Sequence, residues 1–355
     1  MVTLEELLQQ LVERGGSDLH ISAGAPPKIR IDGKLISVDT EILDSEQSQK
    51  LVYSVLDNDQ IARFEKDYEL DMSFGISGLG RFRTNVFMQR GAVASAMRRI
   101  PWEIWKLEDI GMPTDLIQEI CNKPKGLILV TGATGSGKST TLASMIDYIN
   151  SSRSEHIVTI EDPIEFVHRN KGCLVNQREV GSDTRGFLNA LRAILRQDPD
   201  VVLIGEMRDR ETIETALTLS ETGHLTFATL HTSDSVQTIN RIIDVFPSYQ
   251  QSQIRTQLSF TLTSIICQQL LPSATGKGRE LACEIMIATP AIRSLIRDDK
   301  IHQIYSVVQT SGRLGMKTFN QSLFELYTAR KITYDDIIAR STDPDDLKRM
   351  LQKKG

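Results

Sequence analysis

The chain has 355 residues and a formal net charge of −5, with 40% hydrophobic and 25% charged residues. This is the composition of an ordinary globular protein with room for two domains. A mildly acidic chain does not suit a general nucleic-acid coat, so no nucleic-acid partner is expected. No run of about eighteen apolar residues is present, so no transmembrane helix is expected, and the acidic start does not resemble a signal peptide.

The first hundred residues have the pattern of a small α+β domain. Leucines at positions 4, 7, 8 and 11 fall on one face of a helix that Gly15 and Gly16 end. Asp32-Gly33 stands between two short β-prone runs, 28–31 and 34–37, and indicates a hairpin. We expect a second helix from about Ser45 to Phe64, and then three strands near 70–74, 81–87 and 92–98.

A linker is expected over residues 101–113, because prolines stand at both ends of it. In residues 114–355 strands alternate with helices, and three apolar runs suit a sheet covered on both faces: 156–160, 201–204 and 226–230. The sequence therefore predicts an α/β fold, with a RecA-like P-loop domain preceded by a smaller α+β domain in residues 1–100. From about Phe260 onward the pattern becomes mainly helical.

The four cysteines lie far apart, with no C-x-x-C pair, at Cys121, Cys173, Cys267 and Cys283. They are expected to be reduced, mostly buried thiols of a cytoplasmic protein, and not zinc ligands or a disulfide framework.

Residues 132–139 match the P-loop pattern G-x-x-x-x-G-K-[ST] at every fixed position, between an apolar run at 127–130 and a helical segment at 140–146. Backbone N–H groups of such a loop and the positive end of the helix bind a triphosphate. Lys138 is expected to reach the β- and γ-phosphates, and Ser139 to hold Mg²⁺. The candidate residues for ATP are Thr134, Gly135, Ser136, Gly137, Lys138, Ser139 and Thr140. The alternative is an accidental glycine-rich turn.

Three acidic or histidine-bearing segments follow the P-loop, each at the end of an expected strand: 160–165, 200–209 and 222–232. Ligands of open α/β sheets bind at the carboxyl ends of strands. Glu206 is placed where an acid that activates water belongs, and Glu161 is the natural second acid; either carboxylate could instead be a solvated strand end. His231 directly follows a strand, and the pattern leaves a γ-phosphate contact and a structural role equally open.

Arg81, Arg83 and Asn85 alternate with apolar Phe82 and Val86, so the two arginines share one face of a strand. Spacing alone favours an ordinary solvated face. The sharper alternative is a pair of arginine fingers for the ATP of a neighbouring subunit.

Taken together, the P-loop, the acidic box 160–165, the box 196–206 and the histidine box 222–231 resemble the secretion ATPase superfamily, the motors of type II and type IV secretion and of type IV pili. Residues 15–20 and 291–297 resemble further signatures of the pilus retraction branch, the second of them the sequence AIRNLIR. Ser294 replaces its asparagine, and Ala133 replaces a common P-loop proline. Other branches carry a tetracysteine metal site, which is absent from this sequence.

The resemblance implies a PAS-like N-terminal domain, a homohexameric ring, and Mg²⁺-ATP bound between domains. It implies that Glu206 activates water, that Glu161 lies near Mg²⁺, that His231 senses the γ-phosphate, and that Arg81 and Arg83 approach the phosphates. The expected partner is an inner-membrane platform protein of the pilus machine, which places the ring peripherally at the base of the pilus. The resemblance also suggests that Arg293 and Arg297 act in retraction after ATP has been used.

Three functions remain open on the sequence. The first is a hexameric motor ATPase that retracts pili in twitching motility, as main motor or accessory paralogue. The second is a nucleotide-gated scaffold with poor turnover. The third is an ATPase that moves protein or DNA through a secretion channel, which uses the same ring chemistry.

Overall fold

The computed structural model describes residues 2–31, 33–100, 103–341 and 343–352. The chain divides into two compact units, of which the first comprises 1–103 with the short segments 163–167 and 181–183, and the second comprises the remainder. Asp32 of the predicted hairpin and residues 101 and 102 of the predicted linker lie outside the described residues.

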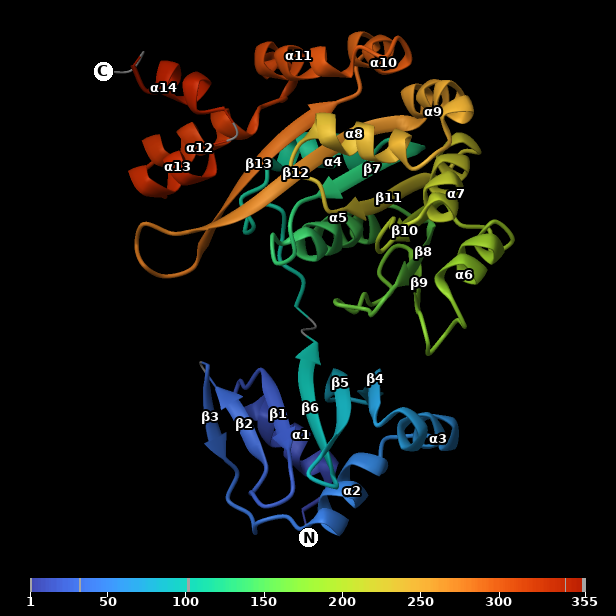
Figure 1. The fold of residues 1–355 in the computed structure, drawn as a ribbon, viewed down its shortest axis with the longest axis vertical. Coiled ribbons are helices and arrows are strands. Elements are labelled where there is room, and N and C mark those ends of the chain that lie inside the picture. Colours follow the sequence, from blue (N-terminus) through green and yellow to red (C-terminus); the bar gives the residue numbers. More distant parts are fainter. Residues whose placement is uncertain (1, 32, 101–102, 342, 353–355) are drawn as a thin grey trace. The chain divides into compact units, whose positions relative to one another are not determined.

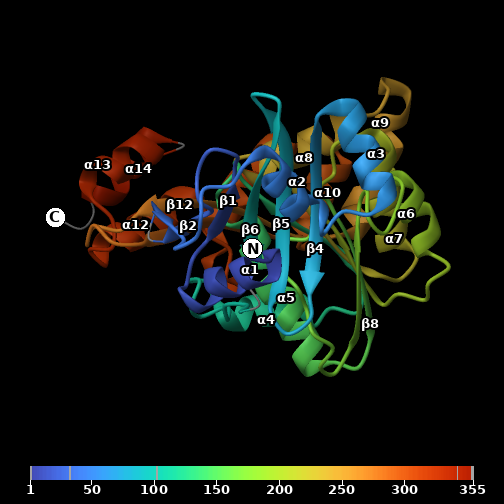
Figure 2. The ribbon, with the colours of Figure 1, turned by 90° about the horizontal axis from the view of Figure 1, so that it is seen from below.

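In the first unit, six described strands form a sheet in the order β3-β2-β1-β6-β5-β4, with every neighbouring pair antiparallel. Figure 2 shows β4, β5 and β6 side by side. The strands are β1 (Asp18–Ile21), β2 (Lys28–Ile31), β3 (Lys34–Ser37), β4 (Glu69–Ile76), β5 (Gly80–Gln89) and β6 (Ala92–Ile100), and the helices are α1 (Leu4–Glu13), α2 (Ser45–Tyr53) and α3 (Asn58–Asp67). Burial of the four α1 leucines in the core of this unit confirms the predicted helical face.

The single helix predicted from Ser45 to Phe64 is wrong, because the chain forms α2 and α3 with a break between them. Asp57 is the N-cap of α3: its Oδ1 accepts a hydrogen bond from the Gln60 backbone N–H at 2.8 Å, and the Asp57 N–H donates back to Gln60 Oε1 at 3.0 Å. This capping box satisfies backbone donors that would otherwise be lost at a helix start. It restarts the helix, so that Leu51 of α2 and Phe64 of α3 both become buried.

The second unit contains a seven-stranded sheet in the order β13-β12-β7-β11-β10-β8-β9. All neighbouring strands are parallel except β12 and β13, which are antiparallel. The strands are β7 (Gly126–Thr131), β8 (His156–Glu161), β9 (Leu174–Glu179), β10 (Val201–Ile204), β11 (Leu225–Leu230), β12 (Leu262–Pro272) and β13 (Arg279–Ile287).

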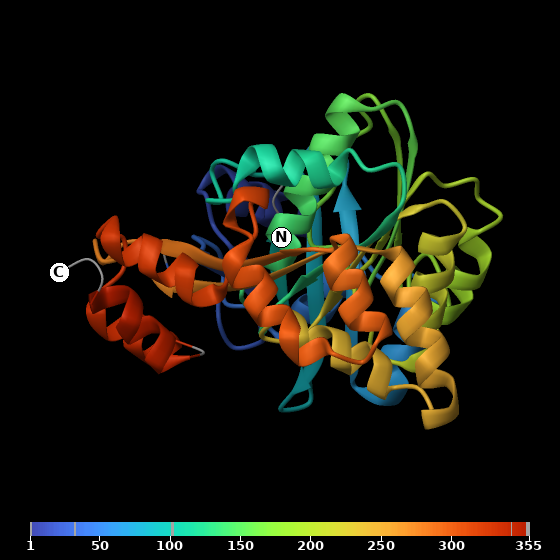
Figure 3. The same cartoon turned by 90° about the horizontal axis from the view of Figure 1, so that it is seen from above.

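Helices cover both faces of this sheet (Figures 1 and 3). One core contains Ile128 and Val130 with α4 and α5, and the other contains Leu127 and Leu129 with α6 to α11. Figure 1 also shows the long β12–β13 hairpin leading toward α12, α13 and α14. The helices are α4 (Thr114–Cys121), α5 (Lys138–Ser152), α6 (Phe187–Ile194), α7 (Arg210–Glu221), α8 (Ser235–Asp244), α9 (Ser248–Thr261), α10 (Pro290–Arg297), α11 (Ile304–Thr310), α12 (Phe319–Thr328), α13 (Tyr334–Arg340) and α14 (Pro344–Gln352).

The prediction that the chain becomes mainly helical from Phe260 is wrong for residues 262–287, which form β12 and β13. Ile265, Ile266 and Cys267 are all buried, because β12 lies inside the sheet between β7 and β13. A strand buried on both faces shows no alternation, so its apolar run looks like a helix segment. The helical pattern holds from Pro290 onward.

The four cysteines are free and buried, as the sequence predicts. Among the described residues, no helix has both the length and the apolar character needed to cross a membrane.

Candidate nucleotide-binding site

The order of strands brings the predicted site segments to one edge of the sheet. The P-loop follows β7, His231 follows β11, Glu206 follows β10, and Glu161 ends β8. These four strands are parallel and adjacent in the order β7-β11-β10-β8. Their carboxyl ends therefore lie together, at the edge where open α/β sheets bind ligands.

The P-loop follows a path that only glycine adopts readily at three positions. Gly132, Gly135 and Gly137 have φ of +142°, +78° and +89°, a region that a Cβ atom disfavours. A Cβ added at Gly132 would also collide with the carbonyl oxygen of Gln268 on β12. Gln268 Nε2 donates to the Ser136 carbonyl at 2.9 Å in a buried hydrogen bond. This bond from β12 helps to fix the backbone conformation of the P-loop.

The helix that follows the P-loop starts without a side-chain cap. Gly137 is the N-cap of α5, and no acidic residue lies in the first turn. The first N–H groups of a helix need partners, and they bind anions well. Lys138 Nζ donates to the carbonyl oxygens of Gly132 at 2.7 Å and Ala133 at 3.0 Å, which holds the ammonium group against the loop. The loop and helix start thus fit a phosphate group.

Glu206 is bound at both of its carboxylate oxygens. Oε1 lies 3.3 Å from His231 Nε2, and Oε2 lies 2.8 Å from Arg208 Nη2. Burial raises the pKa of Glu206, but the hydrogen bond and charge of Arg208, with His231 and Lys138, outweigh it and lower the pKa. Glu206 is therefore held as a carboxylate next to the P-loop lysine.

Backbone contacts fix Glu206 and His231 relative to each other. The Met207 N–H donates to the Thr229 carbonyl at 3.0 Å, and Thr229 Oγ1 donates to the Gly205 carbonyl at 2.5 Å. Since these bonds join the residues on both sides of Glu206 to β11, the acid and the histidine sit on one rigid edge.

Glu161 lies on the neighbouring strand end. Its Oε1 accepts hydrogen bonds from Thr159 Oγ1 at 2.6 Å and from Gln177 Nε2 at 3.1 Å. Gly205 packs against the backbone of Glu161, where a Cβ would lie 3.3 Å from its Cα. The absence of a side chain at Gly205 thus lets the two acidic strand ends approach closely.

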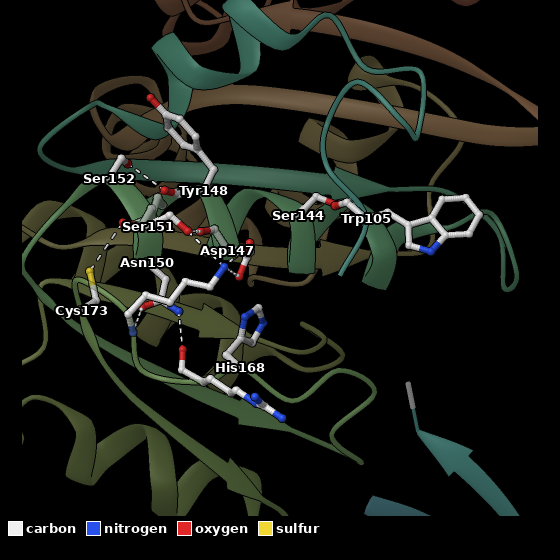
Figure 4. A network of polar contacts seen from close by, with 12 residues as sticks. Trp105, Ser144, Asp147, Tyr148, Asn150, Ser151, Ser152, His168 and Cys173 are labelled. Atoms are coloured by element: carbon white, nitrogen blue, oxygen red, sulfur yellow. Dashed lines mark hydrogen bonds and ion pairs between the residues drawn. The ribbon is translucent and has the colours of Figure 1, made fainter. Parts of the chain in front are cut away.

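The far end of α5 is anchored by a polar network, shown in Figure 4. Fully buried Asn150 donates to the Arg169 carbonyl at 2.7 Å and accepts from the Lys171 N–H at 3.1 Å. The Lys171 ammonium group binds Asp147 at 2.7 Å, and Ser144 Oγ donates to the Trp105 carbonyl at 2.6 Å. These contacts tie the P-loop helix to the segment that follows the acidic box, and to the predicted linker.

Arg81 and Arg83 lie on β5 of the first unit, on the face opposite the buried Phe82 and Val86, as the alternation predicts. Arg81 Nη2 donates to Ser73 Oγ on β4 at 2.6 Å, and Arg83 is exposed. The sheet thus presents both arginines on its outer face.

Sequence reasoning missed Arg208 and Gln268 as site residues. Arg208 stands two residues after Glu206, and its charge beside a candidate base was the available signal. The sequence contains no comparable signal for Gln268, because β12 is not predicted from it. His224, named with the histidine box, precedes β11 and interacts through Nδ1 with the Leu219 carbonyl at 3.0 Å; it lies at the amino end of that strand, away from His231.

Arg293 of the C-terminal signature is not a solvated residue. Its Nε donates to the Ala288 carbonyl at 2.9 Å, and its Nη1 donates to the carbonyls of Ser259 at 2.5 Å and Phe260 at 2.8 Å. It therefore binds the carbonyl end of α9, a favourable place for a cation. Arg297 remains half exposed, with Asp298 at 3.7 Å.

Among the described residues no group of three or more His, Cys, Asp or Glu side chains is arranged to hold a metal. Ser139 and Glu161 provide oxygen donors at the edge that bears the P-loop, and oxygen is the ligand atom that Mg²⁺ prefers. These residues fit a metal ion that takes its remaining ligands from a nucleotide.

A P-loop at the end of a central parallel strand, with two acids and a histidine along the same edge, defines a P-loop nucleoside triphosphatase. The family model described as "Type II/IV secretion system protein" matches residues 2–333. The chain belongs to this family, and its enzymatic class is that of an ATPase.

Two curated relatives from Pseudomonas aeruginosa match over nearly the whole chain. The type IV pilus retraction ATPase PilT is 48% identical, covering 97% of this chain and 99% of the relative, and the type IV pilus ATPase PilU is 42% identical, covering 98% and 91%. A solved structure of the pilus retraction motor PilT with bound ADP matches with a TM-score of 0.91 at 51% identity, over 98% of this chain and all of that one. The expected fold, a RecA-like P-loop domain preceded by a smaller α+β PAS-like domain, is confirmed by this match.

Proposed function

We propose that this protein is a motor ATPase that couples ATP hydrolysis to the retraction of type IV pili. The observation that carries the proposal is the convergence of Lys138, Glu206 and His231 at one sheet edge. Relatives named for pilus retraction and for twitching motility are each 48% identical to this chain. The site supplies the chemistry, and these relatives indicate the work to which it is coupled.

ATP with Mg²⁺ is the proposed ligand. The backbone of residues 134–140 holds the phosphates, and Lys138 turns from the loop carbonyls toward the β- and γ-phosphates. Ser139 and Glu161 would hold a Mg²⁺ ion together with the nucleotide. The ion would supply positive charge that neutralises the phosphate oxygens.

The remaining residues have distinct proposed roles. Glu206, a carboxylate with a lowered pKa, accepts a proton from the attacking water, and Glu161 orients that water. His231 contacts the γ-phosphate and, through its contact with Glu206, makes the position of that carboxylate depend on whether the γ-phosphate is bound. Arg81 and Arg83 approach the phosphates from the PAS-like domain, where arginine stabilises the charge of the transition state.

The proposed assembly is a homohexameric ring. Each subunit has a PAS-like domain in residues 1–100, a linker in 101–113 and an ATPase domain in 114–355. The ring binds an inner-membrane platform protein from the cytoplasmic side, at the base of the pilus, and contacts no nucleic acid.

A second candidate is an accessory retraction motor of the PilU type. It rests on the 42% identity to PilU over 98% of the chain and on Ser294, where the retraction signature has asparagine. An accessory motor supports retraction only beside a main motor, so it would not restore twitching to a strain that lacks both.

The decisive experiment is deletion of the gene and complementation with wild type, Lys138→Ala or Lys123→Ala. Lys123 is a matched control, an exposed lysine whose ammonium group lies 3.2 Å from Glu119. We expect the deletion strain to keep its pili and lose twitching, with rescue by wild type and Lys123→Ala only. Normal twitching together with a secretion defect would reject pilus retraction in favour of a secretion motor.

A further inference from the structure

Glu284 is a buried carboxylate outside the sequence motifs. It lies on β13 opposite Cys267 of β12, and only 4% of the residue is exposed. Its Oε1 accepts a hydrogen bond from the Ser235 backbone N–H at 2.8 Å. Ser235 is the first residue of α8. A carboxylate at this position satisfies an N–H group of the helix start and interacts favourably with the helix dipole.

A second helix start lies near the same carboxylate. β13 is joined to the segment before α12, because the Ile285 N–H donates to the Lys317 carbonyl at 2.9 Å and the Ile285 carbonyl accepts from the Lys317 N–H at 3.1 Å. The backbone of Phe319, the first residue of α12, lies near the Glu284 carboxylate and favours its charged form. Burial, together with the charge of Asp234, raises the pKa of Glu284 despite these hydrogen bonds.

Glu284 is close in the fold to the P-loop. Its cross-strand neighbour Cys267 pairs with Thr131, the last residue of β7. The next residue on β12, Gln268, holds the Ser136 carbonyl of the P-loop. The β12–β13 pair therefore joins the phosphate-binding loop to the start of α8.

The start of α8 lies only four residues after His231, which directly follows β11. Only residues 232–234 separate His231 from Ser235, and four residues span at most about 14 Å. This short segment is held by Asp234, whose Oδ1 caps the Gln237 N–H at 2.8 Å, and by a 2.7 Å contact between the hydroxyls of Thr232 and Thr238. We expect a displacement of Ser235 to shift this short segment and so to disturb the contact of His231 with Glu206.

We propose that Glu284 is a positioning residue for ATP hydrolysis, which fixes the start of α8 so that His231 meets Glu206 and the γ-phosphate. The inference rests on the proposed role of His231. Among the described residues no hydrogen bond joins Glu284 to the P-loop or to Glu206, so it acts on turnover through His231 and leaves nucleotide binding by the P-loop intact.

The test compares Glu284→Gln and Glu284→Ala with the control Asp346→Asn. Glutamine keeps an acceptor for the Ser235 N–H, and alanine removes it. Asp346 is also a buried acid, 5% exposed, and it accepts from Gln309 Nε2 at 2.8 Å and Tyr305 OH at 3.2 Å in the C-terminal helices. It matches the burial of Glu284 but has no contact with α8 among its hydrogen bonds. Steady-state kcat, KM for ATP, and the thermal unfolding midpoint are measured for each variant.

We expect kcat to fall by about tenfold to 10²-fold in Glu284→Ala, the range that small misplacements of catalytic groups produce. The KM should stay within about twofold of wild type, as expected when transition-state interactions alone are lost. Glu284→Gln should restore part of the lost kcat, and Asp346→Asn should lower the unfolding midpoint without lowering kcat.

Equal kcat in Glu284→Ala and Asp346→Asn, a parallel loss of kcat and nucleotide binding, or failure of both Glu284 variants to fold would overturn the positioning role. His231→Ala is measured alongside: wild-type kcat in that variant removes the proposed role of His231 itself. Low kcat in His231→Ala with normal kcat in Glu284→Ala rejects only the present inference.

Discussion

The guanidinium group of Arg208 lies 2.8 Å from Oε2 of Glu206. The negative charge of the candidate base is therefore paired with the positive charge of a residue only two positions along the chain. The other oxygen of Glu206 faces His231. Because Arg208 is itself largely exposed, with 68% of its side chain accessible, its ion pair can open without disturbing the core. The pair lowers the pKa of Glu206 and does not contribute much to the free energy of folding.

Replacing Glu206 by glutamine separates binding from chemistry. Glutamine has the same size but no basic oxygen, so the variant should bind ATP with Mg²⁺ and hydrolyse it slowly. We expect kcat to fall by about 10²-fold or more. Nucleotide affinity and single-turnover hydrolysis are measured on the same preparation. An unchanged kcat would transfer the role of base to Glu161.

Arg208→Ala should shift the pH dependence of activity. Arg208 lowers the pKa of Glu206 through a hydrogen bond and its charge, so its removal raises that pKa. The base then becomes protonated at a higher pH, and the acidic limb of kcat/KM, which lies below pH 4.5 in wild type because the pKa of Glu206 is lowered from 4.5, moves upward. The profile is measured from roughly pH 3.5 to 7. Arg192→Ala, at an exposed position on α6, is the control that should leave the limb in place. A limb that stays put in Arg208→Ala would show that Glu206 does not limit the acidic side.

Arg81→Ala and Arg83→Ala should lower kcat more than they weaken nucleotide binding, if these arginines approach the phosphates. Arginine fingers in phosphoryl transfer supply about 10³-fold or more in rate. The experiment measures kcat and the ATP dissociation constant in both single variants and in the double variant. Arg63→Ala, an exposed arginine on α3, is the control within the same unit. Full activity of the double variant would restore the interpretation of a solvated face.

Sequence analysis predicted those parts of the site that are formed by short, continuous stretches of the chain. The P-loop, Glu206 and His231 each stand in a local pattern next to a strand, and the parallel order of the strands then brings them together. Gln268 and Glu284 could not be predicted in this way, because they lie on β12 and β13, from which Gln268 binds the P-loop and Glu284 binds the start of α8. β12 pairs with β7, whose residues lie more than a hundred positions earlier in the chain. No local sequence pattern predicts that pairing.

A single polar residue also decides the structure where the wider pattern predicts otherwise. The pattern over residues 45–64 predicts one helix, although Asp57, followed three residues later by Gln60, is a helix start signal. The sequence pattern gives Arg293 and Arg297 the same character, because both are charged and about one turn apart. Only the fold shows that Arg293 meets the carbonyl end of α9, while Arg297 does not.

His168 should make stability depend on pH. It is buried in the segment anchored to α5 (Figure 4), and burial lowers its pKa to about 4 from 6.5. The folded protein therefore keeps this histidine neutral while the unfolded chain protonates it below about pH 6.5. Stability is fully present above that pH and is lost as the pH falls toward 4, by a contribution on the order of 3 kcal/mol.

The measurement for His168 is the free energy of unfolding between about pH 7 and pH 4, in wild type and in His168→Gln. Glutamine does not titrate, so the variant should lose less stability over this interval. Identical pH profiles for the two proteins would mean that His168 is solvated in the folded state.

The two arginines of the C-terminal signature should behave differently when each is changed to alanine. Arg293 donates to the carbonyls of Ala288, Ser259 and Phe260, and hydrogen bonds to a charged group contribute about 1.5–3 kcal/mol each at most. We therefore expect Arg293→Ala to lower the free energy of unfolding by about 2 kcal/mol or more and to reduce ATPase activity and twitching together.

Arg297 makes weak contacts, with Asp298 at 3.7 Å and with Ser294 Oγ at 3.3 Å, so Arg297→Ala should change the free energy of unfolding by less than about 1 kcal/mol. If this signature couples ATP use to retraction, Arg297→Ala will hydrolyse ATP normally and twitch poorly, because its side chain is far along the chain from every phosphate motif. Chemical denaturation, ATPase assays and a twitching assay on both single variants make the distinction. Normal twitching in Arg297→Ala would leave the signature with a structural role alone, supplied by Arg293 at the end of α9.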